Sequence, residues 1–326
     1  MEKPAVLYLV IPCYQEEDAL PETARQTSGK LQSLLARGMI AAESRILFVN
    51  DGSTDRTWEQ ICALHRDNPQ VFDGLCLAHN AGHQNALLAG LMAAKDRCDI
   101  AISMDADLQD DIDAIDRMIE AYYAGNEVVY GVRSSRKTDT LFKRMSARLF
   151  YRLMQGMGTE IVYDHADFRL MSRRVLTELA EYHEVNLFLR GLVPTIGFQS
   201  TTVSYQRKER MAGESKYPLR KMVRFAAEGI TSFSVKPLKL IISLGFLMVH
   251  VSLIAFIWAF VNKFMGNTVP GWSSTVCSIW LIGGMQLLCM GIVGEYVGKI
   301  YAEVKHRPRY IIAEDLHEDP EHQTGS

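Results

Sequence analysis

The sequence predicts an α/β protein whose first part folds as a mainly parallel sheet covered by helices on both faces. Short apolar runs alternate with longer segments of helical periodicity from residue 5 to about residue 131. The connections between them are short, as in sheets built from strand–helix–strand units. Polar stretches follow four of the apolar runs, at the strand ends where open sheets of this kind bind ligands.

Each element in this part is predicted from its pattern of apolar residues. Strands are short apolar runs, and helices place apolar side chains three or four positions apart. The expected strands are residues 5–11, 45–49, 72–78, 99–104 and 127–131, and the expected helices are residues 16–37, 55–66, 82–95 and 111–124. The less regular part that follows predicts helices at 143–157, 173–181 and 219–233, strands at 167–171 and 199–206, and a polar loop at 207–216.

Two long apolar segments follow Pro237. Residues 238–261 contain no Asp, Glu or Arg, and as a helix they would extend about 36 Å, enough for a hydrocarbon core of about 30 Å. Residues 274–293 form a second candidate span. Basic residues cluster before the first segment and after the second, so the positive-inside rule predicts cytoplasmic termini. The alternative is a pair of core helices in a soluble protein.

Composition narrows the class of protein. A net charge of −3 gives no case for nucleic-acid binding. The six cysteines show no metal-binding or redox spacing, which indicates a reducing compartment. The N-terminus runs directly into the first expected strand, so no signal peptide is expected. The polar residues 314–326 are expected to be disordered.

Asp105, Asp107 and Gln109 alternate directly after the expected strand at 99–104. In extended chain, residues two apart share a face, so these three side chains can converge on one point. Hard oxygen ligands of this kind suit Mg²⁺ or Mn²⁺, and Mg²⁺ usually lies against substrate phosphates. The segment is a candidate metal–diphosphate site. The alternative is a solvated acidic helix start, because further aspartates follow.

Two other polar loops carry side chains suited to binding. In residues 50–55, Gly52 supplies a tight bend, and Ser53, Thr54 or Asp55 can cap the next helix. Capping does not explain the neighbouring Asp51. Exposed amides at residues 80–84 can bind phosphate or sugar oxygens, although a plain helix cap explains the same residues.

Three motifs occur in order, each after an expected strand: Pro12-Cys13-Tyr14-Gln15-Glu16, Asn50-Asp51-Gly52-Ser53-Thr54-Asp55 and Asp105-Ala106-Asp107. This order resembles the nucleotide-sugar-binding half of inverting family 2 glycosyltransferases, which have the GT-A fold. The sequences His79-Asn80-Ala81-Gly82-His83-Gln84, Asp167-Phe168-Arg169-Leu170 and Gly213-Glu214-Ser215-Lys216-Tyr217 extend the resemblance. Together with the two apolar segments, they are similar to polyprenyl-phosphate glycosyltransferases, the relatives of dolichol-phosphate mannose synthase and bacterial undecaprenyl-phosphate glucosyltransferases.

The resemblance implies a site for the donor. The nucleotide-sugar-binding residues it implies are Pro12, Tyr14, Glu16, Asp51, Asn80, Gln84, Asp105 and Ala106. Asp51 would bind the imide of the base. Asp107 and Gln109 would bind Mg²⁺ or Mn²⁺ directly, and Asp105 would bind either the metal or the ribose. The metal would neutralise charge as the nucleoside diphosphate leaves.

The resemblance also implies a phosphate on a lipid as the acceptor. A phosphate monoester has a second pKa of about 6, so it needs cations more than it needs a general base. Arginine binds phosphate in a bidentate way that lysine cannot. By resemblance, Arg133 and one of Arg144 or Arg148 hold this phosphate, with Arg169 close to them. The alternative is a solvated basic face, or a helix lying on anionic lipid.

Further residues have roles by resemblance. Asp167 would act as a catalytic base or orient Arg169, although such an Asp–Arg pair is as often structural. Arg210 and Lys216 would close over the diphosphate, unless they belong to an ordinary exposed basic loop. The basic start of the helix at 219–233 would hold the catalytic domain against anionic headgroups.

The expected reaction is inverting, metal-dependent transfer of a hexose to undecaprenyl phosphate, with UDP-glucose favoured as donor. Mannose, galactose, N-acetylhexosamine and aminoarabinose donors stay open. A polysaccharide synthase is the second hypothesis, but no tryptophan here follows an arginine as in the Gln-x-x-Arg-Trp acceptor motif. A non-catalytic membrane scaffold is the third, and the intact Asp105, Asp107 and Gln109 set argues against it.

The expected organisation has four parts. Residues 1–216 form the GT-A catalytic domain, 217–236 a juxtamembrane amphipathic helix, 237–297 a two-helix transmembrane hairpin and 298–326 a cytoplasmic tail. The protein is expected in the bacterial inner membrane, with its catalytic domain in the cytoplasm. Expected partners are the nucleotide sugar, the polyprenyl phosphate, further copies of the chain, a flippase and a downstream glycosyltransferase, with no nucleic acid.

Overall fold

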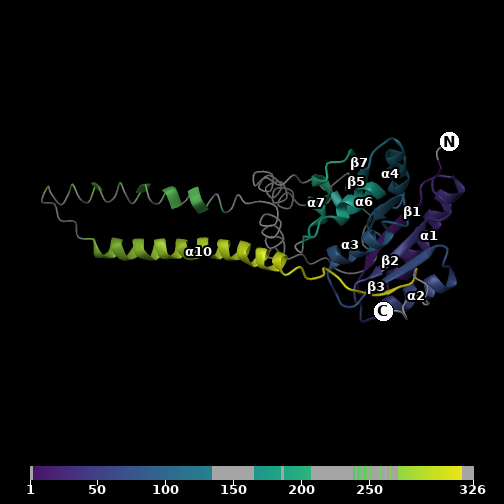
Figure 1. Cartoon of the computed structure of the whole chain (residues 1–326), viewed down its shortest axis with the longest axis horizontal. Coiled ribbons are helices and arrows are strands. Elements are labelled where there is room, and N and C mark those ends of the chain that lie inside the picture. The colour runs from purple at the N-terminus through teal and green to yellow at the C-terminus, as the bar shows by residue number, and fades with distance from the viewer. Residues whose placement is uncertain are drawn as a thin grey trace. The chain divides into compact units, whose positions relative to one another are not determined.

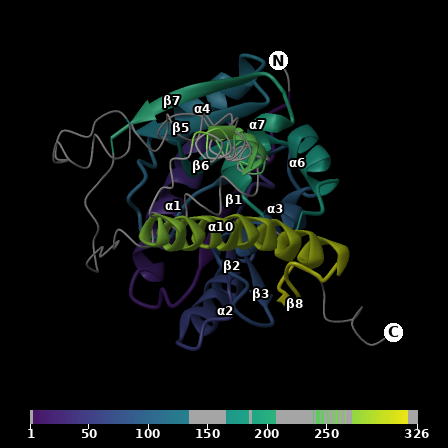
Figure 2. The same ribbon diagram turned by 90° about the vertical axis from the view of Figure 1, so that its left-hand side faces the viewer.

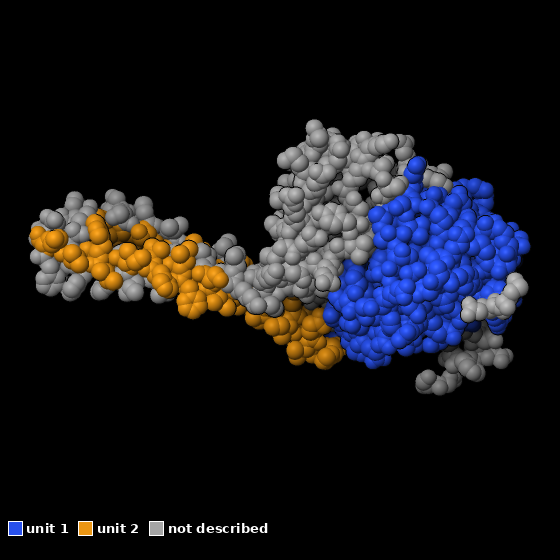
Figure 3. Space-filling view, turned by 90° about the horizontal axis from the view of Figure 1, so that it is seen from above, with its two compact units in different colours: residues 1–148, 160–217, 307–326 blue, residues 149–159, 218–306 orange. Residues whose placement is uncertain are grey.

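The computed structural model describes residues 3–133, 165–184, 187–206 and 271–317, together with scattered positions between 238 and 265. The chain divides into two compact units (Figure 3). The sheet domain comprises residues 1–148, 160–217 and 307–326, and the hairpin unit comprises residues 149–159 and 218–306. The helices expected at 143–157 and 219–233 and the loop expected at 207–216 lie outside the described residues.

The sheet domain is built around one sheet of eight strands (Figure 1). The strands are β1 (Leu7–Cys13), β2 (Arg45–Asn50), β3 (Phe72–Leu77), β4 (Ile100–Ser103), β5 (Val128–Arg133), β6 (His165–Ser172), β7 (Ser200–Tyr205) and β8 (Ile312–Asp315). Their order across the sheet is β7-β5-β6-β4-β1-β2-β3-β8. Strands β3, β2, β1 and β4 are parallel neighbours, whereas β6 and β8 run antiparallel to the strands beside them. The prediction of a mainly parallel sheet is confirmed.

Helices cover both faces of this sheet. They are α1 (Leu20–Ala36), α2 (Thr57–Asp67), α3 (His83–Ala94), α4 (Ala114–Tyr123), α6 (Arg173–Ala180) and α7 (Leu189–Thr195). One core cluster contains apolar residues of α1, α2 and α4, and the other contains those of α3, α6 and α7. Figure 2 shows α1 on one side of the strands and α3 and α6 on the other.

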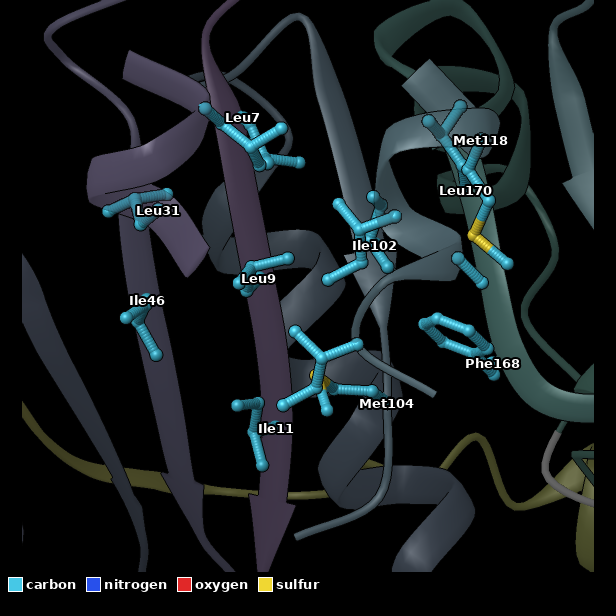
Figure 4. Packing of buried hydrophobic residues seen from close by; sticks show 14 of the residues in the cluster. Leu7, Leu9, Ile11, Leu31, Ile46, Ile102, Met104, Met118, Phe168 and Leu170 are labelled. Carbon is cyan, nitrogen blue, oxygen red and sulfur yellow. The ribbon is translucent and has the colours of Figure 1, made fainter. Parts of the chain in front are cut away.

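Strand β1 lies in the middle of both core clusters. Leu7, Leu9 and Ile11 belong to one cluster and Tyr8 and Val10 to the other, and all five are buried. The close view shows the first three beside residues of the neighbouring strands (Figure 4). Burial on both faces explains why this strand is a continuous apolar run with no alternation. Because β1 to β4 run parallel, the loops that follow them lie at the same edge of the sheet.

Helix α1 begins later than predicted. The sequence predicts a start near residue 16, whereas the helix starts at Leu20, with Pro21 in its first turn. Proline is favoured there because an N–H in the first turn has no acceptor within the helix, so its absence costs no hydrogen bond. The residues before it instead form a turn that contacts the loop after β2, which brings Glu16 into the candidate site region.

Two elements are absent from the sequence prediction. Helix α7 is seven residues long and contains Pro194, so it has too little periodicity to be recognised. Strand β8 overlaps the start of the tail that the sequence predicts to be disordered from residue 314, and for residues 314–317 that prediction is wrong. A strand of four residues is recognisable only from its partner, which lies more than two hundred residues earlier.

Strand β8 fastens the chain after the hairpin unit to the edge of the sheet domain. The amide of Ala78 donates to the carbonyl of Ile311, and the amide of Leu316 donates to the carbonyl of Gly74, each at 2.9 Å. Arg97 forms an ion pair with Asp315 at 2.9 Å. The segment is thus an integral part of the sheet.

In the hairpin unit, α10 (Trp272–Val304) has 33 residues and extends beyond the second apolar segment at both ends. The sequence predicts two membrane spans, at 238–261 and 274–293. Within the described residues, no helix combines the length and apolar character needed to cross a membrane.

At Gly90, helix α3 lies very close to the sheet. A Cβ atom at this position would lie 2.5 Å from a methyl of Val10 and 2.6 Å from a methyl of Val49. Both neighbours are β-branched and therefore cannot easily turn away. Only glycine lets the helix lie this near the strands that carry the site loops.

We expect Gly90→Ala to lower the free energy of unfolding. Overpacking costs about 1–3 kcal/mol, and the better helix propensity of alanine offsets about 1 kcal/mol of this. Thermal unfolding measures the difference. Gly29→Ala on α1 is the matched control, because a Cβ there meets nothing within 4 Å and should be neutral or stabilising. A Gly90→Ala protein as stable as Gly29→Ala would contradict the close approach.

Candidate functional site

The Asp105–Gln109 segment follows β4 as a turn. Strand β4 ends at Ser103, so the motif does not continue in extended conformation as the sequence predicts. The buried Leu108 has a positive φ of 54°, a left-handed conformation that is costly for a side chain of this kind. The amide of Gln109 donates to Asp107 Oδ1 at 3.2 Å. A strained turn, rather than strand alternation, therefore sets the direction of these side chains.

The donor set of this turn fits a divalent cation. Gln109 is 5% exposed, and its side-chain carbonyl oxygen is buried with no hydrogen-bond partner among the described residues. The pKa of Asp105 is raised to about 6, mainly by burial; the charge of His83 lowers it in part, and the carboxylates of Asp110, Asp167 and Asp107 contribute to the rise. A hard cation would relieve this repulsion and satisfy the buried amide oxygen. Within the described part of the chain, no three His, Cys, Asp or Glu residues form a metal cluster.

An ion cluster centred on Asp167 lies beside this turn. Asp167 is 3% exposed, and its Oδ1 accepts from Arg169 at 2.8 Å and from Arg190 Nε at 3.1 Å. Its Oδ2 accepts from Arg190 Nη2 at 2.8 Å. His83 Nε2 lies 3.5 Å from Asp167 Oδ2 and 3.6 Å from Asp105 Oδ1. The imidazole therefore connects the cluster to the Asp105 turn.

Asp167 stays ionised in this environment. Burial alone would raise its pKa, but hydrogen bonds from His83 and Arg190 and the charges of Arg190 and Arg169 outweigh burial. They hold the pKa of Asp167 well below its usual range. A carboxylate held in this way is a weak base, and it is well suited to orienting the groups bound to it.

Gln84 joins α3 to the same cluster. Its side-chain carbonyl accepts from the amide of Leu189 at 3.1 Å, and its Nε2 lies 3.5 Å from Asp167 Oδ2. Arg169 Nη1 donates to the carbonyl of Leu189 at 3.1 Å. The beginning of α7, the middle of β6 and the beginning of α3 are thus bound to one another through side chains.

Asp51 accepts hydrogen bonds from the loop that precedes His83, the first residue of α3. Its two carboxylate oxygens accept from the amides of Ala81 at 2.7 Å and Gly82 at 3.0 Å. The adjacent Gly52 has a φ of 64°, and a Cβ there would lie 2.5 Å from the backbone of His79 and Asn80. The pKa of Asp51 is raised overall, because the effect of burial exceeds the lowering effect of the two backbone hydrogen bonds. The loop after β2 and the loop after β3 therefore form one unit.

The loop after β1 rests on the loop after β2. The amide of Gln15 donates to Ser53 Oγ and the amide of Glu16 to Thr57 Oγ1, each at 3.0 Å. Asp55 Oδ1 accepts from the amide of Thr57 at 3.1 Å, but the N-cap position of α2 is Arg56, which makes no side-chain cap hydrogen bond. Tyr14 is 46% exposed at this edge, so it is not a packing residue.

The predicted site residues fall into three groups. Those at or beside the site loops are Pro12, Tyr14, Glu16, Asp51, Asn80, Gln84, Asp105, Ala106, Asp107, Gln109 and Asp167. Arg169 is 1% exposed, inside the domain, where it binds Asp167 and no surface phosphate can reach it without rearrangement. Arg144, Arg148, Arg210, Lys216 and the side chain of Arg133, which ends β5, lie outside the described residues.

Two residues of the cluster were not predicted. His83 belongs to the His79–Gln84 motif, in which the resemblance gives roles only to Asn80 and Gln84. Arg190 follows the apolar Phe188 and Leu189 without any motif, and only the fold brings it to Asp167. Nothing in the local sequence marks it as a site residue.

A mixed sheet with a Rossmann-like parallel half, and an Asp-x-Asp turn at its ligand-binding edge, defines a GT-A type glycosyltransferase domain. The sequence model described as "Glycosyl transferase family 2" matches residues 8–180, and that described as "GtrB C-terminal hairpin" matches residues 236–300. The chain belongs to glycosyl transferase family 2. It is therefore a glycosyltransferase with a C-terminal hairpin of this kind.

Relatives match nearly the whole chain. The glycosyltransferase YkoT of Bacillus subtilis, described as uncharacterised, is 54% identical over 314 residues, which cover 96% of this chain and 93% of YkoT. A bactoprenol glucosyl transferase of Shigella phage SfV is 40% identical over 306 residues, covering 93% and 97% of the two chains. The crystal structure of glucosyl-3-phosphoglycerate synthase from Mycobacterium tuberculosis is similar at 16% identity and a TM-score of 0.41, covering 70% and 78%. At this identity and TM-score, the structural similarity adds no argument to that from the relatives.

We expect Asp51→Asn to loosen the loop before α3. An asparagine offers one acceptor oxygen where the carboxylate satisfies two amides, and leaving a buried amide unpaired costs about 1–3 kcal/mol. Hydrogen exchange at the amides of Ala81 and Gly82 should accelerate about tenfold or more. Asp18→Asn, at an exposed position in the loop after β1, is the control and should leave both amides unchanged. Unchanged protection in Asp51→Asn would mean that the carboxylate does not anchor the loop.

Proposed function

We propose that this glycosyltransferase transfers a hexose from a nucleotide sugar to a polyprenyl phosphate. The observation that carries the proposal is the Asp105–Gln109 turn, with its buried unpartnered amide oxygen, directly beside the His83–Asp167 cluster. A relative that covers both domain and hairpin at 40% identity is named a bactoprenol glucosyl transferase. The turn supports a nucleotide-diphosphate donor, and the relative supports a lipid acceptor.

The donor binds along the loops after β1 to β4. Tyr14 and Asp51 contact the nucleotide, with Pro12, Glu16, Asn80, Gln84 and Ala106 around it. Asp105, Asp107 and Gln109 would hold Mg²⁺ or Mn²⁺, which would supply positive charge for the leaving diphosphate. The alternative role for Asp105, a hydrogen bond to the ribose, is compatible with its partly exposed side chain, which is 35% exposed.

The reaction is a single displacement with inversion. A phosphate oxygen of the acceptor attacks the anomeric carbon, and the bond from that carbon to the nucleoside diphosphate breaks. The transition state resembles an oxocarbenium ion, so stabilising the leaving group is a large part of catalysis. The acceptor phosphate is largely a dianion at neutral pH and needs little help from a base. The low pKa of Asp167 therefore favours the orienting role for this residue over the role of base.

The acceptor phosphate is held by Arg133 and by Arg144 or Arg148. Arginine suits this task because its planar fork matches two phosphate oxygens. Arg210 and Lys216 close over the diphosphate once both substrates are bound. Arg169 contributes indirectly, because it is buried against Asp167.

The hairpin keeps the catalytic domain at the membrane where such a lipid is found. The apolar segments at 238–261 and 274–293 and the flanking basic residues support a transmembrane hairpin with both termini in the cytoplasm. The bacterial inner membrane is the proposed location. UDP-glucose is the favoured donor because the named relative is a glucosyl transferase. Assembly into oligomers and contacts with a flippase or a downstream glycosyltransferase belong to the same proposal.

The test is a panel of labelled nucleotide sugars with undecaprenyl phosphate and Mg²⁺ or Mn²⁺, using the full chain in membranes. Label in an organic-soluble, mild-acid-labile lipid supports the proposal and identifies the sugar. Label in polymer supports a polysaccharide synthase instead. No metal-dependent transfer from any donor would refute both.

We expect Asp107→Ala to reduce transfer by about a hundredfold or more, because a metal ligand for the leaving diphosphate is lost. Circular dichroism and thermal unfolding should show a folded protein. Asp113→Ala is the matched control, since this aspartate belongs to the same acidic run and its side chain is 82% exposed. Near-normal turnover of Asp107→Ala would contradict the metal assignment.

A further inference from the structure

Residues 307–317, which we call the edge strap, run along the edge of the sheet beside β3 (Figure 2). Tyr310, near one end, packs against the core cluster that contains apolar residues of α3, α6 and α7. Leu316, near the other end, packs against the cluster that contains those of α1, α2 and α4. In the chain, only Lys305 and His306 separate the edge strap from α10. The segment that leads back from the hairpin is therefore anchored in both layers of the sheet domain.

The edge strap alters the end of β3 that leads into the candidate site. Cys76 pairs with Glu314, but the next residue of β3, Leu77, pairs with Ile312. One residue of the edge strap is thus extra between these two pairs, which is the arrangement of a β-bulge. A β-bulge bends the strands and increases their local twist. This one lies at the last residue of β3, directly before the loop that follows it.

The edge strap also holds the first residue of the loop after β3. The amide of Ala78 donates to the carbonyl of Ile311 at 2.9 Å. Two residues earlier, Arg309 Nη1 donates to the carbonyl of Tyr182 at 2.8 Å in a partly buried position. A hydrogen bond from a charged donor is stronger than one between neutral groups. Arg309 therefore fastens the chain just before Ile311 reaches Ala78.

The other end of this short loop is held by Asp51. Its carboxylate accepts from the amides of Ala81 and Gly82, at 2.7 and 3.0 Å. Only two residues lie between these amides and Ala78, so a displacement of Ala78 is passed directly to them. In the proposed function, Asp51 and Asn80 bind the nucleotide. The loop that contacts the donor is thus held between the edge strap and Asp51.

We propose that the edge strap is a positioning element for the donor. By fixing Ala78 it keeps the loop after β3 in the conformation that binds the nucleotide. Arg309 is the positioning residue of this element, because it fastens the edge strap at the end that reaches the loop. The inference rests on the proposed function, in which the nucleotide lies against this loop. It gives the segment that follows the hairpin a part in donor binding.

The first experiment follows hydrogen exchange in the unsubstituted, full-length protein in lipid nanodiscs, with and without UDP or GDP and Mn²⁺. Coupling between two sites is reciprocal, so an edge strap that favours nucleotide binding must itself be stabilised by the nucleotide. We expect exchange at the amide of Ala78 and within residues 310–313 to slow by about threefold or more. If the nucleotide binds but slows exchange only in the loops after β1, β2 and β4, the positioning role is overturned.

The second experiment measures equilibrium binding of UDP or GDP with Mn²⁺ to variants of the same full-length protein. Arg309→Gln removes the charged donor at the loop end of the edge strap, and Asp315→Asn weakens the ion pair with Arg97 at the other end. Arg307→Gln, at an exposed position of the same segment, is the matched control. The thermal midpoint of each variant is recorded, so that lost stability is separated from lost positioning.

We expect Arg309→Gln to weaken nucleotide binding by about 3- to 10-fold, and Arg307→Gln to leave it unchanged. Asp315→Asn should lower the thermal midpoint but change binding by less than about twofold, because its partner on β3 precedes the bulge. If Arg309→Gln does not fold, Tyr310→Leu decides by the same criterion, since it reduces the packing of the same end of the edge strap.

Equal weakening of binding by Arg309→Gln and Asp315→Asn would overturn the inference, because the edge strap would then act only through the stability of the sheet domain. Unchanged binding in Arg309→Gln would overturn it as well. Either result leaves the proposed function intact. The proposed function fails instead, and the positioning role with it, if the unsubstituted protein binds neither nucleotide.

Discussion

The pair formed by Asp167 and Arg169 is the interaction on which the site and much of the sheet domain depend. Both side chains are nearly inaccessible, and removing one partner of a buried pair typically costs about 3–5 kcal/mol. Arg169 also binds the first turn of α7, and Asp167 receives Gln84 and His83 from the first turn of α3. A single carboxylate in an antiparallel strand thus sets the positions of two helices that frame the substrate edge.

The other half of the site relies on backbone contacts. Asp51 binds the amides of the loop after β3, and Gly52 permits the two loops to touch. The loop after β1 is fastened to the loop after β2 through hydroxyl groups. The three loops are therefore bound to one another by side-chain hydrogen bonds. These contacts bring residues that are far apart in the sequence to the same edge of the sheet.

The sequence was sufficient to predict the parallel half of the sheet, because buried strands and amphipathic helices alternate there with short connections. It also located Asp105, Asp107 and Gln109, although a turn at Leu108 rather than an extended strand determines their geometry. Arg190 and strand β8 escaped prediction for a common physical reason. Their partners, Asp167 and β3, are brought to them by the completed fold, and no local periodicity records such contacts.

Strand β8 has a consequence for how the chain can be divided. The edge strand β3 would otherwise present unpaired backbone groups, which recruit other strands and promote aggregation. The protection comes from residues that follow the hairpin, so the domain is complete only when both ends of the hairpin are attached to it. A protein truncated before residue 238 would lack β8, and strand β3 would then be an unpaired edge of the sheet. A fragment that lacks the hairpin would therefore keep this edge of the sheet covered only if residues 307–317 were retained.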